Sequence, residues 1–254
     1  MPETPAYVDT HCHIDSVLDR EQCTWPELLA RMGNHPPAAL VHVACDPARL
    51  AWAEEFARNA AETQNSSDPV IRCAYGIHPH EASLYNDTVE QELIRLQGTP
   101  HAVAFGEIGL DYHYDYSPRD IQCQVFERQL LLAKKLGKPV VLHTREADAD
   151  TLEILTRHAG SELAVHVHCY TGSVSFAQQL LALPGSYYFG FTGVLTFKNS
   201  ENVRAAAQSI PLDRLLLETD APYMAPVPWR GKTAHPGMIP TIAQALADLR
   251  GVSL

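Results

Sequence analysis

Six side chains of metal-binding type each follow a short run of apolar residues in this sequence. They are His11, His13, Glu107, His143, His168 and Asp220. Imidazole nitrogens and carboxylate oxygens are common ligands of zinc, and one tetrahedral zinc ion uses about four of them. Two metal ions that share a bridging carboxylate would use all six. Glu107, in the middle of the order, is the natural bridge.

A pair of divalent cations at such a site favours hydrolysis. Two metal ions about 4 Å apart can hold a hydroxide between them and clamp the oxygens of an ester or phosphodiester in line with its attack. Asp220 could both bind a metal ion and move a proton from the attacking water to the leaving group, and Glu107 would join the two ions. We therefore predict that Asp220 and Glu107 are catalytic residues.

Each of these side chains also has a structural interpretation. A single histidine after a strand is often a satisfied structural residue, Glu107 could form an ion pair at the rim, and Asp220 could cap a turn. His11 and His13, however, are two residues apart, so in a strand both rings project from one face. Because the six side chains follow five separate apolar runs, we favour a metal site over unrelated structural roles.

Five further polar residues are candidates for contacts with a substrate. Arg145 follows His143 by two residues, so it would share that face of the strand and could grip a phosphate with its forked guanidinium. An ordinary ion pair is the alternative. Other residues near the same rim, or on loops after the last two strands where barrels often hold phosphate, would look the same in sequence if they were solvated surface residues. These are His78, His80, Lys198 and Arg230.

The elements that must position these residues alternate between strand and helix. Short apolar runs predict strands over residues 6–9, 39–45, 70–77, 102–111, 139–142, 163–167, 187–191 and 215–217. Helical spacing predicts helices over residues 25–33, 47–60, 89–96, 121–136, 152–155, 176–183, 203–210 and 240–250. Eight such units predict an α/β fold, a TIM-type (β/α)8 barrel with its ligands at the carboxyl rim. The rival, an open doubly wound sheet, usually has a glycine-rich fingerprint after its first strand, where this chain has histidines.

Length and composition fit one ordinary globular domain. The 254 residues are 46% hydrophobic and 19% charged, so we expect a single hydrolase domain over residues 1–254. The net charge of −11 argues against a broad basic surface for nucleic acid. The six cysteines are scattered without a CxxC pair, which favours free thiols in a reducing cytoplasm. No export signal or membrane-spanning run is apparent in the sequence.

Six motifs, spread from the first strand to the last, together resemble one known family. They read DTHCHID, GIHPHEA, GEIGLDYH, LHTREA, HCYTGS and ETDAPY. In type and order they are similar to those of the TatD family of metal-dependent hydrolases, within the amidohydrolase superfamily. The resemblance implies a TIM barrel with two divalent metal ions per subunit (Mg, Mn or Zn). The implied ligands are His11, His13, Glu107, His143, His168 and Asp220.

The resemblance also implies an activity on DNA. Members of the family are described as metal-dependent deoxyribonucleases, including 3′ to 5′ exonucleases, so the expected substrate is DNA, single-stranded or at its 3′ ends. Two departures from the family pattern concern the substrate. The chain keeps the first histidine pair that some nuclease members lack. In addition, its Arg230-Gly231-Lys232 segment is followed by Thr-Ala-His-Pro in place of the Asn-Glu-Pro that is common in the family.

Two alternatives to a deoxyribonuclease remain open from the sequence. One is ester or amide hydrolysis, for example by a D-aminoacyl-tRNA deacylase, an activity that some TatD-like proteins resemble. The other is a noncatalytic barrel whose metal ions are structural. The aromatic segment with Tyr112, Tyr114 and Tyr116 could stack nucleobases in either enzyme, or could pack against the barrel.

Overall fold

The computed structural model describes residues 6–33, 36–63, 65, 68–158 and 160–254. Within them eight parallel strands pair in sequence order, and a bridge between Cys12 and Ala221 joins the last strand's end to the first. The strands are β1 Val8–Cys12, β2 Ala39–Ala44, β3 Val70–Tyr75, β4 Ala102–Asp111, β5 Val140–Arg145, β6 Ala164–Val167, β7 Ser186–Phe191 and β8 Leu215–Leu217. The predicted TIM-type barrel is therefore confirmed. The expectation of no export signal rests partly on residues 1–5, which lie outside the described residues.

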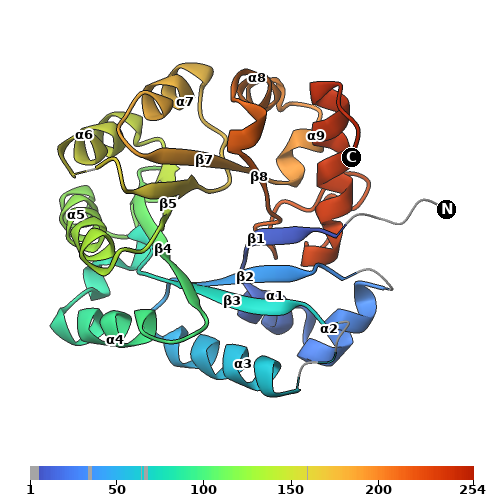
Figure 1. Cartoon of the computed structure of the whole chain (residues 1–254), viewed down its shortest axis with the longest axis horizontal. Coiled ribbons are helices and arrows are strands. Elements are labelled where there is room, and N and C mark those ends of the chain that lie inside the picture. Colours follow the sequence, from blue (N-terminus) through green and yellow to red (C-terminus); the bar gives the residue numbers. More distant parts are fainter. Residues whose placement is uncertain (1–5, 34–35, 64, 66–67, 159) are drawn as a thin grey trace.

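Helices form a ring outside the strands (Figure 1). Each crossover between parallel neighbours carries a helix, as right-handed βαβ units require. The α-helices are α1 Ile14–Glu21, α2 Trp25–Arg31, α3 Leu50–Thr63, α4 Asp87–Gln97, α5 Arg119–Leu136, α6 Asp148–His158, α7 Val174–Leu181, α8 Glu201–Ser209 and α9 Ile239–Arg250. Short 3-10 turns are η1 Pro79–Leu84, η2 Gly193–Thr196, η3 Leu212–Arg214 and η4 Pro236–Met238. No helix in the described part of the chain is long and apolar enough to cross a membrane.

Local sequence explains where several helices begin and end. Asn86 accepts hydrogen bonds from the first backbone amides of α4, and Ser173 does the same for α7. Gly137 adopts the left-handed conformation (φ 63°) and ends α5, as predicted. The prediction that α3 begins at Pro47 was wrong. The side chain of Asp46 accepts the amide of Ala48 at 2.8 Å and makes a separate turn there, so α3 begins at Leu50.

Helix α1 was not predicted, and the predicted ends of two strands came too early in the sequence. The α1 sequence, IDSVLDRE, buries only Ile14, Asp15 and Val17, so its apolar period is too brief to detect. Strand β1 continues beyond the predicted residue 9 through Cys12, and β5 continues beyond residue 142 through Arg145. Polar side chains end the apolar runs before the strands themselves end.

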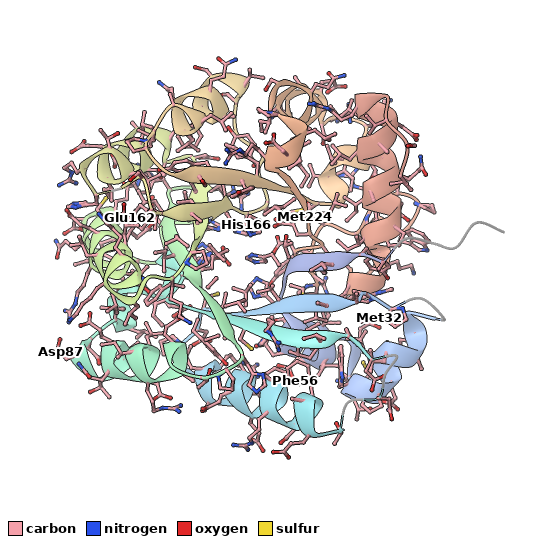
Figure 2. All side chains as sticks on the ribbon, in the orientation of Figure 1. Met32, Phe56, Asp87, Glu162, His166 and Met224 are labelled. Carbon is pink, nitrogen blue, oxygen red and sulfur yellow. The ribbon has the colours of Figure 1, made fainter. Side chains whose placement is uncertain are left out.

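The inside of the barrel is apolar on one side and polar on the other. Neighbouring strands β2 to β5 contribute a small cluster separate from the large core: Val43, Ala74, Ala104 and Val141. On the other side His166, whose place among the strands is marked in Figure 2, lies 2.7 Å from Glu218. A Cβ atom on Gly190 would lie 2.1 Å from Oε2 of Glu218, so β7 needs glycine to make room for this pair. The polar side lies below the mouth that carries the predicted ligands.

Candidate metal centre

Glu107 reaches the mouth of the barrel because β4 and β5 run close together beside it. The register between these strands shifts next to Gly106, so Glu107 lies on a bulge. A Cβ atom on Gly109 would lie 1.9 Å from the carbonyl oxygen of His143, and one on Gly106 would lie 2.6 Å from that of Val141. Both glycines have positive φ angles, 157° at Gly106 and 144° at Gly109. Glycine at these two positions therefore lets β4 set a buried carboxylate against His143.

One oxygen of Glu107, Oε2, faces β1 and the segment after β8. It lies 3.4 Å from Nε2 of His11 and 3.8 Å from Nε2 of His13. The two nitrogens are 3.2 Å apart. Oδ1 of Asp220 lies 3.7 Å from Nε2 of His11 and 3.6 Å from Nε2 of His13. These two imidazoles and the Asp220 carboxylate offer donor atoms that all lie within 4.8 Å of one another.

The other oxygen of Glu107, Oε1, faces β5 and the segment after β6. It lies 2.6 Å from Nδ1 of His143 and 2.6 Å from Nε2 of His168. These two nitrogens are 3.0 Å apart. His78 approaches the same oxygen, with its Nε2 at 3.5 Å. The two oxygens of one carboxylate thus face two different groups of imidazoles.

Hydrogen bonds on the far side of two rings leave a lone pair pointing into the mouth. Nδ1 of His13 lies 3.0 Å from the carbonyl oxygen of Val43, to which only an N–H can donate, so Nε2 keeps its lone pair. Nε2 of His143 lies 3.2 Å from Oδ2 of Asp111 and donates to it, so Nδ1 keeps its lone pair. Such partners fix the tautomer that binds a metal ion.

His78 presents an N–H to the mouth and not a lone pair. Its Nδ1 accepts the backbone N–H of His80 at 3.0 Å, so Nε2 carries the proton of the neutral ring. This N–H points at Oε1 of Glu107. His78 lies among the donor groups with Glu107 and His143, but hydrogen bonding makes it a proton donor at the mouth and not a metal ligand.

The junction of β1 with the segment after β8 holds Asp220 in place. The amide of Asp220 donates to the carbonyl oxygen of His11 at 3.0 Å. Asp9, two residues before His11, accepts the amide of Thr219 at 3.0 Å and its hydroxyl at 2.6 Å. Asp220 itself has a φ angle of 51°. A strained backbone that neighbours on both sides hold in place is typical of a functional site.

Burial and the charge of Glu107 set the pKa values of the groups at the mouth. Burial disfavours the charged form of Glu107, but surrounding imidazoles outweigh it and hold the pKa of this carboxyl well below its ordinary value. Burial, followed by repulsion from His168, lowers the pKa of His11 to about 3, which keeps that ring neutral. Burial raises the pKa of Asp220 to about 6. Burial disfavours the charged form of His168, but Glu107 outweighs it and raises the pKa of that ring to about 9. A divalent cation bound beside Glu107 would replace the proton of His168, as metal binding releases protons from its ligands.

The arrangement of donor atoms therefore fits a divalent cation. At each oxygen of Glu107 two imidazole nitrogens lie about 3 Å apart, and one of them, from His13 or from His143, has its lone pair facing the mouth. The set of nitrogens and carboxylate oxygens suits zinc, manganese or iron. All six residues predicted as ligands lie together at this mouth.

Three residues at the site were missed by sequence reasoning. Asp9, Asp111 and Glu218 are buried acids within or next to strands that carry predicted ligands. Asp111 contacts two imidazoles, from His143 and from His80 (3.0 Å). Glu218 accepts the amide of Cys169, directly after β6. Period two along a strand could have found Asp9, because it lies two residues before His11 in β1 and thus on the same face.

The predicted substrate contacts lie at different places. Nε2 of His78 faces the mouth, while His80 lies one step outward, on Asp111. The guanidinium of Arg145 lies at the end of β5 with its Cζ 4.9 Å from the ring centre of Tyr114. Lys198 and Arg230 are exposed on loops after β7 and β8. Among the described residues, neither shares a hydrogen bond or ion pair with the six predicted ligands.

Comparisons with known proteins agree with this fold. The family model described as "TatD related DNase" matches residues 8–254. The metal-dependent hydrolase YcfH of Escherichia coli strain K12 is 37% identical over 251 residues, which cover 97% of this chain and 89% of YcfH. The human protein named 3′-5′ RNA nuclease TATDN2 is 38% identical over 244 residues, which cover 91% of this chain. That match spans 31% of the human protein's length.

Solved structures are similar over nearly the whole barrel. The TatD homolog YJJV of Escherichia coli superposes with a TM-score of 0.79 at 27% identity and covers 96% of this chain and 90% of YJJV. An amidohydrolase from Saccharomyces cerevisiae, 21% identical with a TM-score of 0.80, shares the fold. The match of residues 8–254 and the identity to YcfH along its length show that this chain belongs to the TatD family of metal-dependent hydrolases.

Proposed function

We propose that this protein is a deoxyribonuclease that hydrolyses phosphodiester bonds with two divalent cations bound at the barrel mouth. The proposal depends on the two carboxylate oxygens of Glu107, which face different groups of histidines. Its Oε2 faces His11 and His13, and its Oε1 faces His143 and His168. One carboxylate between two groups of imidazole donors is how a bridging ligand of two ions is arranged. The metals we propose are Mg, Mn or Zn.

Residues of the chain would divide the remaining work between them. Bound divalent cations lower the pKa of water and offset charge on phosphoryl oxygens. Asp220, a carboxylate at the mouth whose pKa burial raises to about 6, can take a proton from the attacking water and pass it to the leaving oxygen. His78 can donate its Nε2 proton to an oxygen at the mouth. Arg145 forms no ion pair within the described residues, so its guanidinium is available to a phosphate.

A direct test measures metal content and hydrolysis together. The protein is stripped with a chelator, reloaded with Mn, Zn or Mg, and incubated with 3′-ended single-stranded DNA, with RNA of the same sequence and with charged tRNA. We expect two bound ions per chain and release of nucleotides from DNA that requires the metal. Release from RNA alone would favour the activity for which the human relative is named. Release of amino acid without shortening of tRNA would favour a deacylase.

Two results would contradict the proposal. One is a chain that binds a single ion at saturation yet keeps full activity, since Glu107 would then bridge nothing. The other is fully loaded protein that cuts no nucleic acid. The predicted cytoplasmic location and the single domain over residues 1–254 stay predictions.

A further inference from the structure

We propose that Tyr116 binds an unpaired nucleobase of the strand whose phosphodiester lies at the metal centre. This inference rests on the proposed nuclease function and adds a subsite beside the mouth. The subsite belongs to the connector between β4 and α5, where the sequence reads DYHYDYSP. Tyr114 and Tyr116 are large aromatic residues on this connector, and they are 47% and 69% exposed.

The three tyrosines of the connector have different surroundings. Tyr112 is packed, because the guanidinium of Arg119 covers its ring at 4.4 Å and its hydroxyl hydrogen-bonds to Asp150. Of the three, it is therefore unsuited to stack a base. Tyr114 and Tyr116 stack on each other with ring centres 5.4 Å apart and planes 10° from parallel. The sequence left open whether these tyrosines pack against the barrel or stack on nucleobases. Tyr112 packs, and base stacking remains possible for Tyr114 and Tyr116.

Tyr116 is the open end of this stack. Tyr114 already has Tyr116 against it and the guanidinium of Arg145 over it at 4.9 Å. Tyr116 has Tyr114 as its stacked partner and the ring of His80 at its edge, 4.8 Å between centres and 77° between planes. In the part of the chain that the structure describes, no other ring or guanidinium packs on Tyr116. A flat aromatic face beside a catalytic mouth is what a nucleobase stacks on.

The connector is held rigidly in this shape. Oδ1 of Asp111 accepts the amides of His113 (2.9 Å) and Tyr114 (3.1 Å) at its start. At its far side the hydroxyl of Ser117 donates to the carbonyl oxygen of His80 at 2.8 Å, and buried Gln122 donates to the carbonyl oxygen of Ser117 at 2.9 Å. The loop that carries the exposed rings is thus preorganised, so stacking of a base does not require the loop to lose further conformational entropy.

The subsite lies within reach of a strand at the mouth. His80 links the two: its ring centre is 4.8 Å from that of Tyr116 and 6.4 Å from that of His143. Charges along one strand are about 3.4 Å apart in a B-form helix and farther apart when the strand is extended. A strand with its phosphodiester beside His143 can therefore set a base from the next few nucleotides on Tyr116. Arg145, beside the same stack, can contact the phosphate between them.

Charge explains why such a subsite is needed. With a net charge of −11 the protein has no broad attraction for a polyanion, so local contacts must hold the strand. Stacking is insensitive to base identity because every base has an aromatic face. Stacking on Tyr116 does require that the base be unstacked from the adjacent bases of its strand and unpaired from a complementary strand. We therefore expect a preference for single-stranded ends and little preference for sequence.

The test measures protein variants on both normal and modified substrates. The metal-loaded protein, Tyr116→Leu and Tyr116→Phe are compared on a single-stranded oligonucleotide and on the same strand made abasic at each terminal position in turn. Tyr116→Leu should lower kcat/KM for the normal strand roughly 5- to 100-fold. Tyr116→Phe should stay within about twofold, because it keeps the ring. For the wild type, removing the base at one position should lower kcat/KM by the same factor as Tyr116→Leu does on the normal strand. On the strand that is abasic at that position, Tyr116→Leu should lower kcat/KM no further.

A second readout does not depend on turnover. Stopped-flow mixing with a strand carrying 2-aminopurine at that position should quench its fluorescence in the wild type and in Tyr116→Phe, but not in Tyr116→Leu. Equal losses by Tyr116→Leu on normal and abasic strands, or no loss, would overturn the inference and leave the nuclease proposal standing. If no loaded protein cuts any strand, the nuclease proposal fails. The quenching pattern alone then decides whether Tyr116 stacks a base.

Discussion

The chain has two histidine pairs with the same spacing, and they are used differently. His11 and His13 end a strand, so both rings leave the same face and place two Nε2 atoms 3.2 Å apart beside Oε2 of Glu107. His78 and His80 flank the start of a 3-10 turn, where the first ring accepts the amide of the second. Spacing alone therefore does not identify a metal-binding pair. The backbone decides which nitrogen is left with a lone pair.

Glu107 joins the two pairs, so its removal should have the largest effect. In Glu107→Gln the amide keeps the size of the side chain but can no longer carry the negative charge that the imidazoles surround. We expect loss of hydrolysis on the order of 10³-fold or more and loss of bound metal. Elemental analysis and initial rates on the same preparation measure both. A variant that kept its metal and its rate would show that Glu107 is only a structural acid.

The second largest effect should separate the two pairs. In His13→Gln we expect metal content to fall and activity to drop roughly 100-fold or more, because a lone-pair donor is lost. In the matched variant His78→Gln the metal content should be retained and activity should drop about 10-fold, since only a proton donor is lost.

Metal content is the deciding measurement for this comparison. Loss of metal in His78→Gln equal to that in His13→Gln would mean that the second pair also coordinates an ion. The tautomer assigned to His78 from the amide of His80 would then be wrong.

Much of the mouth could be predicted because side chains in a strand repeat every two residues on one face. Parallel strands end at one rim, and side chains two residues apart share a face, so the ends of five apolar runs indicated six donors that the structure brings together. The barrel followed from the alternation of strand and helix.

The rest depended on hydrogen bonds across the fold. Sequence could not tell that Nδ1 of His78 accepts an amide or that Asp111 lies between the rings of His80 and His143, because the register shift within β4 and the turn at η1 set those contacts. It also could not tell that Arg119 packs Tyr112 while Tyr116 stays open. Side-chain partners that are 30 or more residues apart have no local signature.

An intermediate effect should come from Asp111, which touches the second pair but not the first. Its Oδ2 accepts the N–H of His143 and thereby fixes the lone pair of Nδ1. Asp111→Asn should weaken metal affinity about 10- to 100-fold on the Oε1 side of Glu107, with ions on the Oε2 side unaffected. Titration of stripped protein with zinc should show one weakened and one unchanged step. Two equally weakened steps would contradict a role confined to His143.

The smallest effect should come from the ion pairs that Arg128 of α5 makes with Glu90 and Asp87 of α4, beside the 3-10 turn η1 that follows His78. Tyr85 ends that turn, and its hydroxyl donates to Glu90 at 2.7 Å, while Nε of Arg128 donates to the same carboxylate at 2.5 Å. The hydrogen bond from Arg128 lowers the pKa of Glu90 below its ordinary 4.5. Because the Arg128 side chain is 47% exposed, solvent screens the pair. We expect Arg128→Met to cost under about 1 kcal/mol of unfolding free energy.

The pH dependence of that small cost can be stated with its sign. A carboxyl with a lowered pKa stabilises the fold above its unfolded pKa, and the stabilisation is lost as the pH falls through the lower folded value. The difference in urea midpoint between the wild type and Arg128→Met should thus be full at pH 6 and shrink below about pH 4.5. Hydrogen exchange at pH 6 should be faster in η1 of the variant and unchanged in β1. A difference that persists undiminished in acid would mean that Arg128 acts through packing on Tyr85, over whose ring it lies at 5.3 Å, and not through Glu90.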